Sequence, residues 1–549
     1  MPDTTPLHRT APLDALIIGA GFSGMYMLHS LRDRLGLNAL AVERGSDVGG
    51  TWFWNRYPGA RCDSESHSYS YAFSEELWRG WEWSQRYPDH NEIRRYMRYV
   101  ADRLDLKRDI RFDTKVTACR WDAAANLWRV DTEGGETLSA RFLITGVGCL
   151  STANVPALPG LEDFEGRWYH TGDWPQDGVD FAGLRVGQVG TGSTGIQSAP
   201  VIAEEAAHLT VFQRTANYST PANNQPLTGE RKAWIRENRE AIRRVMNATT
   251  NGHPFAMENR SVHDVTDAQV DEILEAAWDF GGLQFRAGFN DVLLDETANV
   301  KLARFVKRKI RSIVKDPAKA AILAEIDHPY AGKRPPIDSG YFETFNRENV
   351  DLVDLRADAI ERVTKTGIRL ESGREIALDV IVFATGYDAL TGPLIKLNIT
   401  GEDGRTLVKE WEAGPKTHLG LQVAGFPNLF TITGPGSPSV LCNMPVPIEQ
   451  HVEWITDCIA HMRDVGATKI ETTEAAMADW GREVQRAANA TLLSRVPHSW
   501  YLGANVPGKP RVFMPYAGGM ARYRAHCAEV AAKGYEGFVL ERVAEAAAR

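Results

Sequence analysis

Short continuous apolar runs alternate with longer amphipathic stretches along most of the chain. The run Ala15–Ile18 is followed by a glycine-rich turn and then by a helix-compatible segment from Met25 to Leu35. A second run, Arg185–Val189, has the same surroundings. Short apolar runs bounded by glycine are typical of buried parallel strands. The pattern therefore predicts two strand–turn–helix units in one chain.

Between about residues 226 and 327 the pattern changes. Strand signals become sparse, and charged amphipathic stretches such as 230–237 and 302–310 are typical of surface helices. Strand character returns at 350–355 and 380–384. We expect an α/β fold with two Rossmann-like dinucleotide-binding domains and a helical insertion. Residues 1–147 and 386–549 would form the first domain, 148–224 and 332–385 the second, and 225–331 the insertion within the second.

The overall charge and the cysteines argue against several classes of protein. The 62 basic and 71 acidic residues give a net charge of −9, and no block of Lys and Arg would follow a phosphate backbone. We therefore expect no nucleic-acid partner. The six cysteines are scattered, without a C-x-x-C pair or a ligand-like spacing to histidine. This spacing argues against a structural metal, a redox dithiol and a secreted disulfide scaffold.

The N-terminus and the apolar segments point to a cytoplasmic location. The first 14 residues lack the apolar core of a signal peptide. The sequence also has no uninterrupted apolar run of about 18 residues, the length that spans a bilayer. We expect a soluble cytoplasmic protein without a membrane partner, present as a monomer or a homodimer.

The first glycine turn, Gly19-Ala-Gly21-Phe-Ser-Gly24, matches the nucleotide-binding pattern G-x-G-x-x-G. Its glycines allow a tight turn and a close approach of the backbone to a pyrophosphate, which the following helix N-terminus attracts. Glu43 lies 19 residues beyond Gly24, at the end of the next apolar run. A carboxylate there can bind ribose hydroxyls and repels a 2′-phosphate, so we interpret this turn as the FAD site. A glycine turn without a ligand is the alternative.

The second glycine turn, Gly190-Thr-Gly192-Ser-Thr-Gly195, differs at the corresponding polar position. Arg214 lies 19 residues beyond Gly195 and is followed by Thr215. A guanidinium at this position favours a 2′-phosphate through paired charge-assisted hydrogen bonds, and Thr215 can add a hydroxyl donor. The second nucleotide is therefore predicted to be NADPH rather than NADH. A surface arginine without a ligand is the alternative.

Two longer motifs indicate which protein family the chain resembles. Residues 164–175, Phe-Glu-Gly-Arg-Trp-Tyr-His-Thr-Gly-Asp-Trp-Pro, match F-x-G-x-x-x-H-x-x-x-W-P. Residues 50–63, Gly-Thr-Trp-Phe-Trp-Asn-Arg-Tyr-Pro-Gly-Ala-Arg-Cys-Asp, match G-x-W-x-x-x-x-[FY]-P-G-x-x-x-D. With both motifs complete, the chain resembles the type I Baeyer–Villiger monooxygenases over nearly its whole length. Related flavin monooxygenases that oxidise nitrogen or sulfur usually lack the Trp-Pro ending, here Trp174-Pro175.

The resemblance implies that NADPH reduces FAD, that O₂ forms a C4a-peroxyflavin, and that the peroxide attacks a ketone to give an ester or lactone. It places the catalytic arginine at Arg334 and its partner aspartate at Asp63. A guanidinium can stabilise the peroxide anion and the oxyanion of the adduct without losing a proton, and Asp63 would orient it. The alternatives are a solvated surface cation for Arg334 and a helix N-cap or structural ion pair for Asp63.

The resemblance also assigns residues around the second nucleotide. Lys333 becomes a further contact to the 2′-phosphate, although an exposed lysine beside the catalytic residue is an alternative. Trp500 lies on a loop that closes over NADP, where its indole N–H could bond the nicotinamide ribose or the substrate. Plain packing is the alternative for both Trp52 and Trp500. We interpret His170 as a structural or hinge histidine.

The sequence thus predicts a Baeyer–Villiger monooxygenase that oxidises a ketone, cyclic or bulky, with FAD, NADPH and O₂ and without a metal. The alternatives are an N- or S-oxygenating flavin monooxygenase, a disulfide reductase-like flavoprotein, against which the missing C-x-x-C argues, and a non-catalytic nucleotide sensor. The predicted FAD contacts are Gly19, Gly21, Phe22, Gly24, Glu43, Gly50, Thr51, Trp52, Asp63, Tyr69, Val116 and Met444. The predicted NADP contacts are Gly190, Thr191, Gly192, Ser193, Thr194, Gly195, Gln197, Arg214, Thr215, Lys333 and Trp500.

Overall fold

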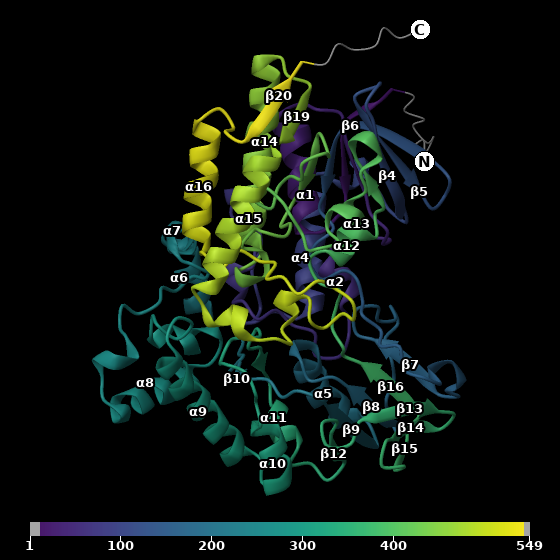
Figure 1. Cartoon of the computed structure of the whole chain (residues 1–549). Coiled ribbons are helices and arrows are strands. Elements are labelled where there is room, and N and C mark those ends of the chain that lie inside the picture. The colour runs from purple at the N-terminus through teal and green to yellow at the C-terminus, as the bar shows by residue number, and fades with distance from the viewer. Residues whose placement is uncertain (1–10, 543–549) are drawn as a thin grey trace.

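The computed structural model describes residues 11–542, which contain two large sheets, one in the upper and one in the lower half of Figure 1. The upper sheet has the strand order β17 (Ile399–Thr400), β4 (Val116–Asp122), β5 (Leu127–Thr132), β6 (Thr137–Thr145), β1 (Leu13–Ile18), β2 (Ala39–Val42) and β3 (Ile110–Arg111), and β18 (Leu429–Thr431) also pairs with β6. Strand β1 runs parallel to both of its neighbours. It is therefore an inner strand, which explains its continuous apolar sequence.

Helices from both ends of the chain surround this sheet. They are α1 (Phe22–His29), α2 (Thr51–Trp54), α3 (Glu75–Arg79), α4 (His90–Arg103), α12 (Gly392–Ile395), α13 (Leu407–Glu410), α14 (Pro445–Val465), α15 (Glu474–Asn489) and α16 (Met520–Ala532). Helix α1 packs along α14, and the two-stranded antiparallel sheet of β19 (Lys469–Thr472) and β20 (Phe538–Glu541) lies beside them (Figure 1). The C-terminal third of the chain thus returns to the sheet that the N-terminus began.

The lower sheet is entirely parallel. Its order is β12 (Val350–Asp354), β9 (His208–Gln213), β8 (Arg185–Val189), β16 (Val380–Phe383) and β7 (Arg167–His170). Helices α5 (Ser193–Glu205) and α11 (Tyr341–Thr344) pack against each other, and the small sheet β13 (Ile360–Thr364), β14 (Gly367–Leu370) and β15 (Glu375–Ala377) adjoins it. The predicted fold class, with two Rossmann-like units, is confirmed by these two sheets.

The segment between β9 and β12 is mainly helical. It contains α6 (Gly229–Glu237), α7 (Arg239–Ala248), α8 (Asp267–Phe280), α9 (Glu296–Ile313) and α10 (Pro317–Ala324). Two short strands that the sequence did not reveal, β10 (Thr220–Pro221) and β11 (Ile337–Asp338), pair in parallel where the chain enters and leaves this segment. This pairing fixes both ends of the helical segment at one place. The domain bounds given above remain our proposal.

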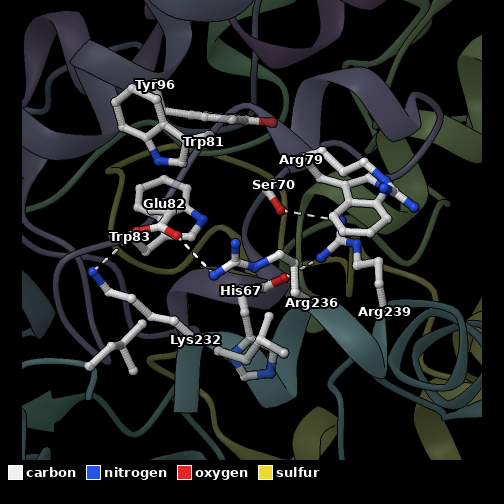
Figure 2. A pocket seen from close by; sticks show the side chains of 13 residues that line it. His67, Ser70, Arg79, Trp81, Glu82, Trp83, Tyr96, Lys232, Arg236 and Arg239 are labelled. Atoms are coloured by element: carbon white, nitrogen blue, oxygen red, sulfur yellow. Dashed lines mark hydrogen bonds and ion pairs between the residues drawn. The ribbon is translucent and has the colours of Figure 1, made fainter. Parts of the chain in front are cut away.

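A buried arginine joins the helical segment to the upper region. Arg239 on α7 is 6% exposed and donates hydrogen bonds to the carbonyls of His67 (2.5 Å) and Tyr71 (3.0 Å) and to the Ser70 hydroxyl. Figure 2 shows it at a hollow walled by Trp81, Trp83 and Tyr96, whose rim carries ion pairs between Glu82 and the α6 residues Lys232 and Arg236. The two segments that meet here lie about 160 residues apart in sequence, so the contact is a tertiary one.

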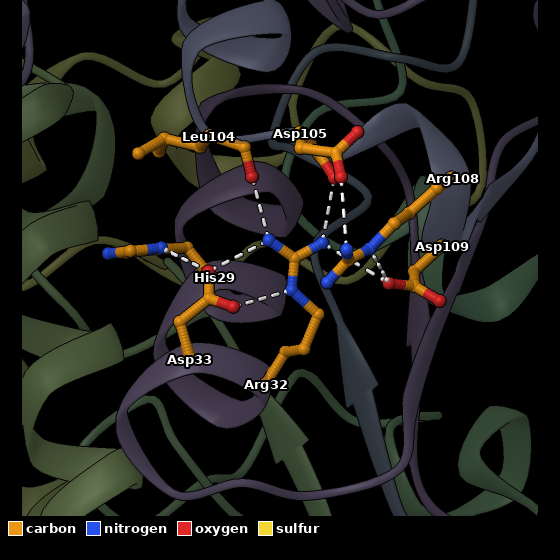
Figure 3. A network of polar contacts seen from close by, with 7 residues as sticks. All are labelled: His29, Arg32, Asp33, Leu104, Asp105, Arg108 and Asp109. Atoms are coloured by element: carbon orange, nitrogen blue, oxygen red, sulfur yellow. Dashed lines mark hydrogen bonds and ion pairs between the residues drawn. The ribbon is translucent and has the colours of Figure 1, made fainter.

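The first helix ends earlier than the sequence predicts. It is α-helical only to His29, and residues 30–34 form a wider π-helical turn. In Figure 3 the guanidinium of Arg32 in this turn donates to the carbonyls of Leu104 (2.7 Å) and Asp105 (2.8 Å) and contacts Asp33 and Asp109. All of these partners except Asp33 lie more than 70 residues from Arg32 along the chain. The local hydrophobic pattern therefore could not reveal the change of helix type.

Three features of residues 11–542 bear on the class of protein. No helix in this range has the length and apolar character needed to cross a bilayer. The same range contains no group of three or more His, Cys, Asp and Glu side chains placed to hold a metal ion. All six cysteines are buried and free.

Candidate active site

The first glycine turn connects β1 to α1. Gly19 has a φ of +104°, and a side chain on Gly24 would place its Cβ only 1.8 Å from the Gly19 carbonyl oxygen. The N-cap of α1 is Gly21, and no side chain caps the helix. The first amide groups of α1 therefore remain available to an anion, as nucleotide binding requires.

Glu43 lies directly beside this turn. It is 6% exposed, and its two carboxylate oxygens accept hydrogen bonds from the amides of Ala20 and Gly45, each 2.8 Å long. Burial raises the pKa of Glu43, and the two amide donors oppose that rise. The amide of Thr114 donates to the Glu43 carbonyl, which brings the strand that begins at Val116 to the same place. The sequence-predicted FAD contacts around Glu43 therefore lie together.

A second glycine pair approaches the first turn. A Cβ on Gly50 would lie 2.8 Å from the Cα of Gly21, so the motif at 50–63 starts in contact with the first nucleotide turn. Thr51 and Trp52 follow in α2. The indole N–H of Trp52 donates to the Tyr69 hydroxyl at 3.1 Å, and the Phe22 ring lies 5.3 Å from the Tyr69 ring. These aromatic side chains form one wall next to the turn.

The second glycine turn has the same construction. Gly190 has a φ of +112°, and α5 begins after Gly192, again without a side-chain cap. The Thr191 hydroxyl donates to the Thr215 carbonyl at 3.0 Å. The N-terminus of α5 is therefore surrounded by Thr191, Ser193 and Thr194. It lies close to the part of the chain just beyond Arg214. The open helix N-terminus again suits a pyrophosphate.

A cationic cluster lies beside the second turn. Arg214 is exposed, and Lys333 is close enough that the two cations repel each other. Burial, reinforced by Arg214, lowers the pKa of Lys333 to about 8 against the opposing effect of Asp327. His498 joins the cluster through a contact of 3.3 Å with Asp327. The predicted pair of cations for a 2′-phosphate is thus formed by two segments 119 residues apart in the printed sequence.

Arg334 and Asp63 are in contact, as the resemblance to the family implied. The Arg334 Nε donates to Asp63 Oδ2 at 3.2 Å, and Nη1 donates to the Val440 carbonyl at 3.4 Å. Burial works against the charged form of both groups. For Arg334 the neighbouring Asp63 outweighs burial, and its pKa lies above the ordinary value. For Asp63 burial outweighs the opposing effect of Arg334, and its pKa is raised. The guanidinium keeps a side-chain exposure of 27%, whereas Asp63 is 9% exposed. Asp63 therefore holds a cation whose other donors remain accessible.

Gln197 joins this ion pair to the helix of the second nucleotide turn. Its amide nitrogen donates to the Arg61 carbonyl at 3.0 Å and to Asp63 Oδ1 at 3.4 Å, and its oxygen accepts from the Tyr57 hydroxyl at 2.8 Å. The sequence prediction made Gln197 an NADP contact. In the structure its side chain connects α5 to the 50–63 motif, and a direct NADP contact stays a prediction.

The segment that carries Trp500 touches the loop that carries Arg334. The Ser499 hydroxyl donates to the Gly332 carbonyl at 3.3 Å, and a Cβ on Gly332 would lie 2.5 Å from a methyl group of Val496. Trp500 is partly exposed, and its ring lies 4.5 Å from that of Tyr501. A movement of the 496–502 segment would therefore reach Lys333 and Arg334 directly.

His170 and Trp174 lie at the end of β7 in the lower sheet and just beyond it. His170 ends β7, is 3% exposed, and accepts a hydrogen bond from the Gly172 amide at Nδ1. Burial lowers its pKa, so the neutral form is favoured. Trp174 packs against Tyr169 and Phe181. These contacts fit the structural interpretation of His170 that the sequence favoured.

Four residues near Arg334 were not singled out from the sequence. Both Arg286 and Arg334 act electrostatically on Tyr501, Cys442 and His253. Tyr501 stands next to the predicted Trp500 and Cys442 two positions before Met444, so their motifs pointed to the region. Arg286 and His253 come from the helical segment, where no motif marked them. The hollow of Figure 2 includes none of these residues and none of the glycine turns.

The arrangement fits two nucleotides bound on either side of one guanidinium. Each glycine turn presents uncapped helix amides, the first with a carboxylate beside it and the second with two cations. Arg334 lies on the loop that begins at Lys333, and Asp63 lies at the end of the motif that starts against Gly21. This is the architecture of a protein that binds two dinucleotides and places a permanent cation between them.

Comparison with known proteins agrees with this architecture. Residues 14–220 match the family model described as flavin-binding monooxygenase-like. A Baeyer–Villiger monooxygenase of Pseudooceanicola batsensis (strain ATCC BAA-863 / DSM 15984 / KCTC 12145 / HTCC2597) is 43% identical over 97% of this chain and 97% of its own length. A solved structure of an oxidized steroid monooxygenase bound to NADP is 48% identical, superposes with a TM-score of 0.92, and is matched over 97% of this chain and all of the other. The protein is thus a flavin-binding monooxygenase with two nucleotide folds. Within that class, the chain belongs to the type I Baeyer–Villiger monooxygenases.

A further relative has a different printed activity. A phenazine N-monooxygenase of Lysobacter antibioticus is 40% identical over 96% of this chain and 96% of its own length. Relatives at about this level of identity therefore include enzymes named for either reaction. The residues of the site must distinguish ketone oxygenation from nitrogen oxygenation in this chain.

Proposed function

We propose that the chain is an NADPH- and FAD-dependent monooxygenase that converts a ketone into an ester or lactone with O₂. The observation that carries the proposal is the ion pair in which Arg334 Nε lies 3.2 Å from Asp63 Oδ2. Its support comes from the chemistry of the guanidinium, because a group that never deprotonates favours developing negative charge on oxygen. Oxidation of nitrogen or sulfur by a protonated, electrophilic oxidant has no comparable need for such a cation.

Different residues of the chain would bind FAD, NADPH and the substrate. The first turn and Glu43 would hold FAD, and the second turn with Arg214 and Lys333 would hold NADPH. Bound FAD, reduced by NADPH, supplies the chemistry that transfers one oxygen atom of O₂ to the substrate. Arg334 would bind the carbonyl oxygen of the ketone as negative charge collects on it, and Asp63 would keep the guanidinium in place. The Trp52–Tyr69 wall and the 496–502 segment would exclude water.

The proposal is tested by the products formed from competing substrates. The holoenzyme is supplied with NADPH, ¹⁸O₂ and, in separate reactions, cyclohexanone, phenazine and a dialkyl thioether. We expect ¹⁸O-labelled lactone as the product with the highest kcat/KM. Labelled phenazine N-oxide formed with a higher kcat/KM than the lactone would contradict the proposal and favour N-oxygenation, which the phenazine N-monooxygenase relative makes the second candidate.

The oligomeric state and the cellular location are proposed as well. We propose a monomer or a homodimer in the cytoplasm, in keeping with a described chain without a membrane-spanning helix. Light scattering of the purified holoenzyme measures the mass against the 60.9 kDa chain. A mass above that of a dimer contradicts the proposed assembly.

A further inference from the structure

Arg286 is a guanidinium without a protein counterion near the predicted reaction centre. It lies in the 3₁₀ helix Leu283–Gly288 of the helical segment. Its Nε is fully buried and has no hydrogen-bond partner, and no hydrogen bond or ion pair joins any of its nitrogens to another residue among 11–542. Its side chain is partly exposed, and burial lowers the pKa of its guanidinium.

The fold directs Arg286 towards Arg334. Its neighbour Phe285 packs on the rings of Trp278, Phe305 and Tyr330 in the core of the helical segment, at centroid distances of 5.9, 5.8 and 5.7 Å. Phe285 thereby fixes the 3₁₀ helix. Arg286 itself acts on Tyr501 and Cys442, the same two side chains on which Arg334 acts. The two guanidiniums therefore border one space, Arg286 from the helical segment and Arg334 from the loop that follows this segment.

The charges in this space do not balance. Arg334 is paired with Asp63 at 3.2 Å, which accounts for one positive and one negative charge. His253 is buried. Burial, together with repulsion by Arg286 and Arg334, lowers its pKa well below the ordinary value, so it supplies no negative charge. Burial raises the pKa of Cys442 to about 12, so this thiol supplies no negative charge either. One uncompensated positive charge remains on Arg286.

An unpaired guanidinium in such surroundings is costly, because burial removes its hydration without supplying acceptors. A ligand with a carboxylate would supply both the charge and two acceptor atoms in the planar arrangement that a guanidinium matches. The neighbouring Arg334 strengthens this preference, since its repulsion of Arg286 falls when an anion binds. A neutral ester offers only a weaker, uncharged acceptor.

We propose that Arg286 binds the carboxylate of the substrate, so that the enzyme favours ketones that carry a carboxylate remote from the reacting carbonyl. The inference rests on the proposed function and specifies its substrate class. Arg334 would hold the ketone oxygen at one side of the space, and Arg286 would hold the carboxylate at the other. The substrate would thereby be oriented by two cations with separate tasks.

A matched pair of ketones tests this inference. The holoenzyme and its Arg286→Met variant are compared on 4-oxocyclohexanecarboxylate and on its methyl ester, with lactone formation as the readout. We expect the wild type to favour the acid. The variant should lose roughly 10- to 100-fold in kcat/KM for the acid, the value of a hydrogen bond to a charged group, and change little for the ester. Arg286→Lys should recover part of the loss, because it keeps the charge but not the planar fork.

A binding measurement without turnover keeps this test separate from the proposed function. Cyclohexanecarboxylate, which cannot be oxygenated at a carbonyl, is titrated into the oxidised holoenzyme, and the change in flavin absorbance gives its Kd. We expect that Kd to rise roughly 10-fold or more in Arg286→Met, and to stay unchanged in Arg308→Met, an exposed arginine of the same helical segment paired with Asp271.

The outcomes distinguish the two hypotheses. If no ketone is oxidised by any form while cyclohexanecarboxylate binding depends on Arg286, the proposed function fails and the carboxylate site stands. If ketones are oxidised with an acid-to-ester ratio that Arg286→Met does not alter, the inference is overturned and the proposed function stands. A Kd for NADP⁺ that weakens in parallel with the acid activity also overturns the inference, because Arg286 would then serve the nucleotide.

Discussion

Arg334 receives its position from three segments that are far apart in the sequence. Its own loop follows Lys333, its counterion Asp63 ends the 50–63 motif, and the Val440 carbonyl accepts from its far nitrogen at 3.4 Å. A side chain held in this way needs little rearrangement when negative charge appears beside it. At the scale of single residues, the proposed chemistry depends on this one cation.

Replacement of Arg334 by methionine therefore separates binding from chemistry. We expect ester formation to fall roughly 10²- to 10³-fold, the usual loss when one oxyanion donor is removed. FAD content and flavin reduction by NADPH should persist, because the glycine turns are untouched, and the reduced flavin should then yield hydrogen peroxide. The measurements are product analysis and peroxide release. Ester formation at the wild-type rate would contradict the role of Arg334.

Lys333 gives nucleotide binding a dependence on pH. Burial next to Arg214 lowers the pKa of the lysine to about 8, so its charge is present below that pH and is lost as the pH rises. A bound 2′-phosphate favours the charged form and raises the pKa again, so the affinity should fall progressively above about pH 8. We expect the Kd of 2′,5′-ADP to rise between about pH 7 and 9.5, where the phosphate is already fully ionised.

The control ligand for this effect is 5′-ADP, which lacks the 2′-phosphate and should show a flat profile over the same range. Lys333→Met should weaken 2′,5′-ADP and remove its pH dependence, with Arg214 left as the remaining cation. A slope that persists in Lys333→Met would assign the titration to another group.

At the scale of elements, the two glycine turns combine tight packing with an open surface. A Cβ on Gly195 would lie 2.2 Å from the Gly190 carbonyl oxygen, whereas a Cβ on Gly192 meets nothing within 4 Å. Gly192 has a φ of −81°, which any residue adopts without strain. Gly195 therefore serves the packing of helix on strand, and Gly192 keeps the helix N-terminus accessible.

The two glycines should respond differently to alanine. Gly195→Ala should lower the stability by about 1–3 kcal/mol, because helix and strand must separate. Gly192→Ala should unfold like the wild type but bind NADP⁺ roughly 10-fold more weakly, because the methyl group occupies the approach of the pyrophosphate. Thermal unfolding and the Kd of NADP⁺ measure the two effects. Wild-type affinity in Gly192→Ala would mean that the nucleotide does not approach this helix.

At the scale of the whole molecule, the helical segment is held to the upper sheet region by a buried arginine. Arg239 ties α7 to the carbonyls of His67 and Tyr71, and the pairs of Glu82 with Lys232 and Arg236 lie outside it. Buried hydrogen bonds from a charged group stabilise far more than exposed ion pairs do. The docking of the segment that carries Arg286 should therefore depend on Arg239.

Arg239→Met should loosen this docking. The unpaired carbonyls of His67 and Tyr71 should cost about 2–4 kcal/mol, and proteases should cut sooner within residues 225–331. The control is Arg236→Met, which removes an exposed pair and should cost less than about 1 kcal/mol. Urea unfolding and timed proteolysis provide the measurements. Equal effects of the two variants would show that Arg239 does not secure the segment.

The sequence predicted those features that depend on contacts between residues close together along the chain. Glycine turns, the adjacent strands and the polar residues Glu43 and Arg214 form within single strand–turn–helix units, so their spacing was visible. The β10–β11 pairing and the π-helical turn at 30–34 depend on partners more than 70 residues away. Periodicity within one segment contains no information on such partners.

The sequence by itself determined the two nucleotide folds, the different preference of each for a ribose or a 2′-phosphate, and the family, because these depend on local spacing and on residue type. The resemblance to the family also implied that Asp63 partners Arg334 and that Lys333 acts with Arg214. Only the tertiary structure decided the contacts themselves. It placed Asp63 at 3.2 Å from Arg334, and it joined the side chain of Gln197 to this ion pair. It also left Arg286 without a counterion beside Arg334, since electrostatic balance depends on distance in space and not on distance along the chain.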